Sequence, residues 1–170
     1  MSDWKMVTLV GEDQPGIVAQ TTDALYQNGL TLGESSMMRL GGNFSMMMMV
    51  SGEGDLNAAL APVARALNLR LHIDDIAGRL HQHLAPNIQI RVMGADQPGI
   101  VARVTGALAA SGFNILELES DVAGTAQNPV YIMTIQGISE AAVETLQQAV
   151  DGLGEEGVDV SVSAIDTLFA

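Results

Sequence analysis

The chain contains the segment GEDQPGIVA at residues 11–19 and repeats it as GADQPGIVA at residues 94–102. Eight of the nine positions agree at an offset of 83 residues, and at the same offset Gly29 matches Gly112. Further along, Gly52 stands opposite Gly137, which predicts a two-residue insertion in a loop of the second copy. Two copies of about 80 residues therefore fill the chain, and a repeat of this length predicts two small domains in tandem.

Residue periodicity predicts the same elements in each copy. Apolar residues alternate before the repeated segment, as in a strand, and recur at helical spacing after it. A hairpin, a second helix and a closing strand follow, and the hairpin of the second copy is expected to have a longer loop. The predicted hairpin strands and closing strand are residues 30–40, 44–50 and 69–73 in the first copy and residues 113–122, 130–135 and 158–164 in the second.

The resulting order βαββαβ is that of a ferredoxin-like unit, so the predicted fold class is α+β with two such units in tandem. Right-handed crossovers place both helices on one face of each antiparallel sheet and leave the other face bare. The expected boundaries are a first domain at residues 1–78, a linker at 79–86 and a second domain at 87–170. The bare faces and the apolar strand at 44–50 predict assembly between the halves or between chains, and hence a homo-oligomer.

Composition and charge exclude several classes of protein. Of the 170 residues 48% are apolar, which is enough for a folded core, and there is no cysteine for disulfides or thiolate metal sites. A formal net charge of −13 repels nucleic acids and anionic membranes, so direct binding to either is not expected. No apolar run approaches the roughly 20 residues of a membrane span, and the N-terminus does not resemble a signal peptide. A soluble cytoplasmic protein is therefore expected.

The strongest candidate site is the turn between the first strand and the first helix, Asp13 to Gly16, with its copy Asp96 to Gly99. One interpretation is structural: aspartate caps the helix, proline presets φ and glycine tightens the turn. The other is functional, because unpaired N–H groups at a helix start bind a carboxylate or phosphate, and glycine lets a ligand approach. The residues themselves leave both interpretations open. Asn114 offers an amide that both donates and accepts, whereas the matching Thr31 offers a hydroxyl.

Other motifs favour structural roles. The segment at 152–157 fits G-x-G-x-x-G but follows a helix and precedes a strand, the reverse of a dinucleotide site, so we interpret it as a loop. The three histidines, His72, His81 and His83, do not make a convincing zinc site. We interpret the methionine run at 46–49, with Met37 and Met38, as core. No serine lies in a nucleophile-elbow sequence, so neither an enzyme nor a metal or cofactor is predicted.

The repeated Gly-x-Asp-Gln-Pro-Gly-Ile-Val-Ala segment, followed by a helix and by Gly-Leu-Thr-Leu or Gly-Phe-Asn-Ile within βαββαβ, resembles the ACT domain. ACT domains are regulatory modules that typically sense amino acids. The resemblance implies a site between adjacent ACT units, where the first turn supplies backbone amides to the ligand carboxylate and a residue opening the second strand, often Asn, helps hold it. The residues so implied are Asp13, Gln14, Pro15, Gly16, Ile17 and Thr31 in the first copy and Asp96, Gln97, Pro98, Gly99, Ile100 and Asn114 in the second.

Two ACT units with no further domain resemble the glycine cleavage system transcriptional repressor family. This resemblance implies an amino-acid-responsive regulator that binds a DNA-binding transcription factor rather than DNA, with glycine or serine as candidate ligands. The alternative is a structural, oligomerising ACT module without a small-molecule ligand. Saturable amino-acid binding distinguishes the first hypothesis from the second.

Overall fold

A computed structural model describes residues 4–77, 84–95, 98–153 and 157–165. The chain divides into two compact units, unit 1 (Met1–Gln82) and unit 2 (His83–Ala170). The expected linker at 79–86 lies mostly outside the described residues, as do His81 and His83. Each unit has its own hydrophobic core, so each is stabilised by its own packing.

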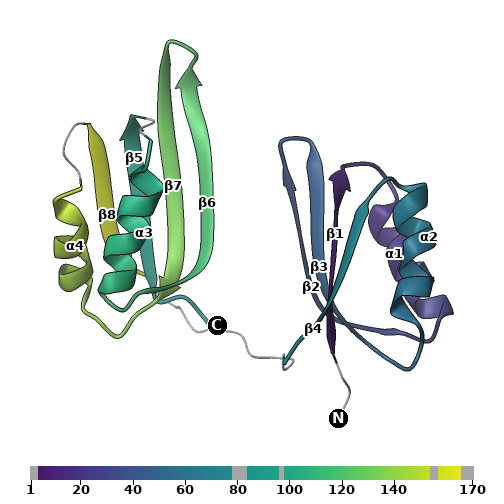
Figure 1. Ribbon diagram of the computed structural model, residues 1–170. Coiled ribbons are helices and arrows are strands. Elements are labelled where there is room, and N and C mark those ends of the chain that lie inside the picture. Colours follow the sequence, from purple (N-terminus) through teal and green to yellow (C-terminus); the bar gives the residue numbers. More distant parts are fainter. Residues whose placement is uncertain (1–3, 78–83, 96–97, 154–156, 166–170) are drawn as a thin grey trace. The chain divides into compact units, whose positions relative to one another are not determined.

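Unit 1 has the predicted order βαββαβ, with its four strands in a single antiparallel sheet. The sheet order is β2-β3-β1-β4, so β2 and β4 are the edge strands, and both helices cover one face of the sheet (Figure 1). Alternate residues of the two central strands, such as Val7 and Met48, are buried against these helices. The elements are β1 (Lys5–Glu12), α1 (Ile17–Gln27), β2 (Thr31–Leu40), β3 (Asn43–Ser51), α2 (Leu56–Ala66) and β4 (Arg70–Asp75).

Unit 2 repeats this architecture, with sheet order β6-β7-β5-β8 and both helices again on one face (Figure 1). The prediction of two ferredoxin-like α+β units with helices on one face is thereby confirmed. The elements are β5 (Ile88–Ala95), α3 (Ile100–Ala110), β6 (Asn114–Thr125), β7 (Asn128–Ile138), α4 (Val143–Asp151) and β8 (Val158–Ala164).

The hairpin of unit 2 corrects two predictions. Lys5 pairs with Val50, whereas its counterpart Ile88 pairs with Gly137, so the insertion is four residues rather than two. It does not lengthen a loop: β6 and β7 have 12 and 11 residues against 10 and 9 in β2 and β3. The turn at 126–127 is as short as that at 41–42. Because β6 and β7 are each two residues longer than their counterparts β2 and β3, the extra residues pair with one another and form no additional loop.

The expected two-residue insertion rested on matching Gly52 with Gly137. The structure shows that these two glycines have different roles. Gly52 has a φ of 140°, whereas Gly137 is required by close packing. A Cβ at Gly137 would lie 2.3 Å from the carbonyl oxygen of Asn114. Glycines that serve different local needs do not mark equivalent positions.

The methionine-rich strand is only partly core. Met46 and Met48 lie in the core, and Met49 is also buried, but Met47 is 48% exposed. Met37 and Met38, on the edge strand β2, are also exposed, so the core prediction is wrong for them and for Met47. The physical reason is the alternation of side chains, which directs Met47 to the face without helices.

Candidate functional site

The first DQPG turn, residues 13–16, ends where α1 begins. Gly16 is the residue before the helix and has a φ of 92°, a left-handed conformation that glycine adopts without strain. The first helical hydrogen bond joins Gln20 N–H to the Gly16 oxygen at 2.9 Å. The N–H groups of residues 17–19 therefore have no acceptor among the described residues, and the positive end of the helix dipole adds to their field.

The second DQPG turn, residues 96–99, ends in the same geometry. Gly99 has a φ of 84°, and Arg103 N–H bonds to the Gly99 oxygen at 3.0 Å. The N–H groups of residues 100–102 are thus also unpaired among the described residues. Asp96 and Gln97, which we predicted as site residues, lie outside the described residues, whereas Pro98 and Gly99 are exposed.

Asp13 does not cap α1, contrary to the structural interpretation of the sequence. Its backbone N–H bonds to the Gly42 oxygen at 3.0 Å, which holds the turn against the tip of the hairpin. Its carboxylate lies 2.6 Å from Nε of Arg39 on β2. The helix instead begins after Gly16, without a side-chain cap, so its first amides stay open.

Arg39 is a site residue that sequence reasoning missed. Unit 2 has Val122 at the same place, 83 residues later along the matching strand. The bulges at the start of the two strands, between Leu32 and Ser35 and between Ile115 and Glu117, fix this correspondence. The two turns therefore differ in charge, because only the first has an arginine at this position.

The side chain of Gln14 has a structural role that the sequence repeat did not reveal. Its side-chain Nε2 donates to the carbonyl oxygen of Leu67 at 2.7 Å. Leu67 is the residue that ends α2, so this bond ties the first turn to the second helix. The contact helps to hold the turn that presents the free amides.

Ile17 and Ile100, the last residues of the repeated motif, have side chains that are buried in the two cores. Only their backbone groups are available to a ligand. Pro15 is exposed on the surface of the first turn.

Thr31 and Asn114 do not meet the DQPG turn of their own unit. Thr31 pairs with Ser51, beside the Lys5–Val50 pair, so it lies at the end of the sheet where β1 begins, whereas the turn follows the other end of β1. At about 3.3 Å per residue, the length of β1 separates them by roughly 25 Å. Asn114 has the same position in unit 2, where it pairs with Ile138. Neither residue can therefore contact a ligand bound at the turn of its own unit.

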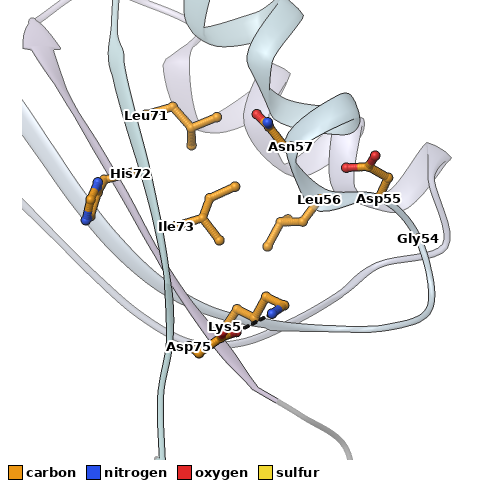
Figure 2. A pocket seen from close by; sticks show the side chains of 9 residues that line it. All are labelled: Lys5, Gly54, Asp55, Leu56, Asn57, Leu71, His72, Ile73 and Asp75. Atoms are coloured by element: carbon orange, nitrogen blue, oxygen red, sulfur yellow. Dashed lines mark hydrogen bonds and ion pairs between the residues drawn. The ribbon is translucent and has the colours of Figure 1, made fainter.

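A separate groove of about 560 Å³ lies in unit 1, at the end of the sheet remote from the DQPG turn. Figure 2 shows Leu71 and Ile73 of β4 pointing toward α2 and Leu56, with His72 on the other side of the strand. At one end of the groove Lys5 forms an ion pair with Asp75. Sequence reasoning missed this groove because its walls come from three separate segments.

Within the described part of the chain, no three His, Asp or Glu side chains lie close enough together to hold a metal ion. The helices described there are also too short or too polar to cross a membrane.

Sequence comparison identifies a domain family and two named relatives. A family model described as the ACT domain matches residues 6–81 and again residues 87–163. The glycine cleavage system transcriptional repressor of Escherichia coli (strain K12) is 27% identical over 119 residues. The matched region is 68% of this chain but only 63% of the repressor, less than two thirds of its length. A UPF0237 protein of Methanococcus maripaludis is 36% identical over 77 residues, which are 45% of this chain and 84% of that protein.

Solved structures match the chain over nearly its whole length. A protein of unknown function from Galdieria sulphuraria has a TM-score of 0.76 and 26% identity, with 97% of this chain and 99% of that one covered. A structure solved under the provisional name glycine cleavage system transcriptional repressor has a TM-score of 0.71 and 20% identity, with 97% and 98% covered. At this identity the second likeness is one of fold.

Proposed function

This chain belongs to the ACT domain family, and from that premise we propose that it is an amino-acid-responsive regulatory protein rather than an enzyme. In this proposal its role is similar to that of the glycine cleavage system transcriptional repressor, its relative at 27% identity. It binds a small amino acid, with glycine and serine as the candidates, and acts through a DNA-binding transcription factor without binding DNA itself. The net charge of −13 supports indirect action.

The observation that carries this proposal is the pair of open helix starts at Gly16 and Gly99. Each presents a first turn of N–H groups that bond to no acceptor in the described part of the chain, at the positive end of a helix dipole, which is a favourable place for a carboxylate. Neither glycine has a side chain to keep a ligand from the backbone. Every amino acid carries a carboxylate, so the open helix starts support an amino acid as ligand. Which amino acid binds depends on the residues around the carboxylate.

Selectivity in this proposal comes from residues near the carboxylate. Asn114 can donate to and accept from one ligand, so it suits an amino acid that has both an ammonium and a carboxylate. Thr31 offers only a hydroxyl. Because neither lies near the turn of its own unit, each acts on a ligand held by another ACT unit. The predicted ligand residues are therefore the two turns, Asp13 to Ile17 and Asp96 to Ile100, with Thr31 and Asn114 each contributed by an ACT unit other than the one whose turn holds the ligand.

The ligand acts by shifting a population. An amino acid that binds one arrangement of ACT units more tightly than another favours that arrangement, and the partner protein binds the two arrangements with different affinity. The effect on the partner cannot exceed the difference in ligand affinity between the two arrangements.

Isothermal titration of the full chain with glycine, then serine and larger amino acids, tests the proposal. We expect saturable binding of a small amino acid, and a loss of about tenfold in affinity in Asn114→Ala, because one charge-assisted hydrogen bond contributes about 1.5 kcal/mol. Asn57→Ala is the matched control, since Asn57 is exposed and lies in the groove of unit 1.

Binding that is weakened equally by both substitutions contradicts the assignment of Asn114. Heats of dilution for every amino acid contradict the ligand and favour the second candidate, an oligomerising module. One observation supports that candidate: Met38, Met47 and Leu40 are exposed on β2 and β3. Sedimentation that shows self-association independent of amino acids is its expected signature.

A further inference from the structure

The last strand of each unit is an edge strand, and the two units differ in whether a side chain bonds to its outward backbone groups. In unit 2 the side chain of Gln147 on α4 donates to the Val160 oxygen at 2.9 Å and accepts from Val162 N–H at 2.8 Å. These bonds satisfy two backbone groups of β8 that face away from the sheet. An exposed strand edge otherwise presents such groups as a template for another strand.

In unit 1 the same two positions are open. Leu71 and Ile73 correspond to Val160 and Val162, because they pair with Leu9 and Val7, whereas Val160 and Val162 pair with Val92 and Ile90, 83 residues later. The buried residues Leu60 and Ala64 of α2 match Leu146 and Val150 of α4, so the place of Gln147 is taken by Ala61, whose side chain has no hydrogen-bonding group. Within residues 4–77, no side chain bonds to the outward backbone groups of Leu71 or Ile73.

The groove of unit 1 lies directly beside this open edge. Leu71, Ile73 and Leu56 provide an apolar floor, and Leu71 and Ile73 are only partly buried although they pack on the core (Figure 2). Asp55 and Asp75 bring two carboxylates against the single ammonium of Lys5. The edge therefore offers backbone hydrogen bonds, an apolar floor and an excess of negative charge in one place.

We propose that the β4 edge and this groove form a docking site for an extended, basic segment of a partner protein, which adds to the sheet of unit 1 as a fifth strand. Its backbone bonds to the Leu71 oxygen and the Ile73 N–H, as the Gln147 amide does in unit 2. Its apolar side chains enter the groove, and basic side chains further along the same face of the segment pair with Asp55 and Asp75. This inference goes beyond the proposed function, since it needs no amino-acid ligand.

Charge favours a basic partner over a second copy of this chain. Each copy carries a net charge of −13, so two copies repel one another over long range, whereas a basic segment is attracted and its association is accelerated.

Amide hydrogen exchange on the full chain, without amino acids, tests the docking site. The probe is an acetylated and amidated heptapeptide with lysine at positions 1 and 7, valine at positions 3 and 5 and threonine at positions 2, 4 and 6, so that valine and lysine share one face. The same peptide with glutamate in place of lysine is its control. In the free chain we expect Ile73 N–H to exchange faster than Val162 N–H. Saturating lysine peptide is expected to slow the exchange of Ile73 by about tenfold and to leave Val162 unchanged.

Matched charge variants test the electrostatic part. Asp75→Asn is expected to weaken the lysine peptide about threefold, and Asp74→Asn less than twofold, because Asp74 lies beside the groove but does not line it. Both variants remove the same exposed charge from the same strand, so both are expected to fold.

Three results overturn the inference: no protection of Ile73, equal binding of the glutamate peptide, or equal effects of the two variants. Protection of Ile73 that grows with protein concentration in the absence of peptide also overturns it and identifies a second copy of the chain as the occupant. None of these results depends on the amino-acid titration, so failure of one proposal is distinguishable from failure of the other.

Discussion

At the scale of single residues, the DQPG turns show how one short motif combines several physical requirements. Glycine is needed at its fourth position because φ is 92° at Gly16 and 84° at Gly99. Asp13 and Gln14 hold the turn to the hairpin and to α2 through contacts with Arg39 and Leu67. The motif therefore stabilises a turn after which the first helix amides bond to no described acceptor, and its structural and functional interpretations are compatible.

Alanine substitutions at Gly99, which precedes α3, and at Gly106, within α3, should change the stability of unit 2 in opposite directions. Gly99→Ala is expected to destabilise unit 2 by about 1–2 kcal/mol, because alanine is strained at positive φ although a Cβ meets no atom there. Gly106→Ala, inside the helix and equally free of contacts, is expected to stabilise by about 0.5–1 kcal/mol. Urea unfolding measures both changes. The same sign for both would show that backbone conformation does not determine the role of Gly99.

At the scale of elements, the two units differ most at their strand edges. The hairpin of unit 2 is two residue pairs longer than that of unit 1. Gln147 closes the edge of β8, whereas the edge of β4 is open. The faces without helices also differ: Met47 lies across from Thr8 in unit 1, whereas Thr134 lies between Arg91 and Glu119 in unit 2. Duplicated folds have thus acquired different surfaces.

The edge bonds of Gln147 lead to a prediction within unit 2. Gln147→Leu, which removes the amide from a side chain of similar size, is expected to destabilise unit 2 by about 1–2 kcal/mol, through the loss of its two hydrogen bonds to the β8 backbone. The exchange of Val162 N–H should accelerate at the same time. Gln148→Leu is the matched control, because Gln148 is exposed. Equal effects of the two substitutions would contradict an edge-closing role for Gln147.

At the scale of the whole molecule, charge and packing dominate. Twenty acidic residues against seven basic ones surround two separate hydrophobic cores. A negatively charged surface attracts basic partners and repels polyanions such as nucleic acids. Each core involves residues of one unit only, so each unit can keep its fold while its surface contacts change.

The net charge predicts that the chain by itself does not bind DNA. A mobility-shift assay with a DNA duplex at low salt should show no complex at micromolar protein, with or without glycine, because the chain has few cations to replace DNA counterions. A basic protein in the same assay establishes that weak, sequence-independent complexes are detected. A complex that disappears as salt is raised would contradict indirect action, and a local basic surface would then have to be found.

The sequence by itself determined the repeat, the order of the elements, the fold of each unit and the start of α1 and α3, because these depend on local periodicity and on glycine and proline conformation. Only the tertiary structure decided that Asp13 pairs with Arg39, that four inserted residues lengthen strands rather than a loop, and that Thr31 and Asn114 lie far from the turns of their own units. It also decided that one sheet edge is closed and the other open. These contacts join residues distant in sequence, and they depend on strand order and register, which no local pattern of residues specifies.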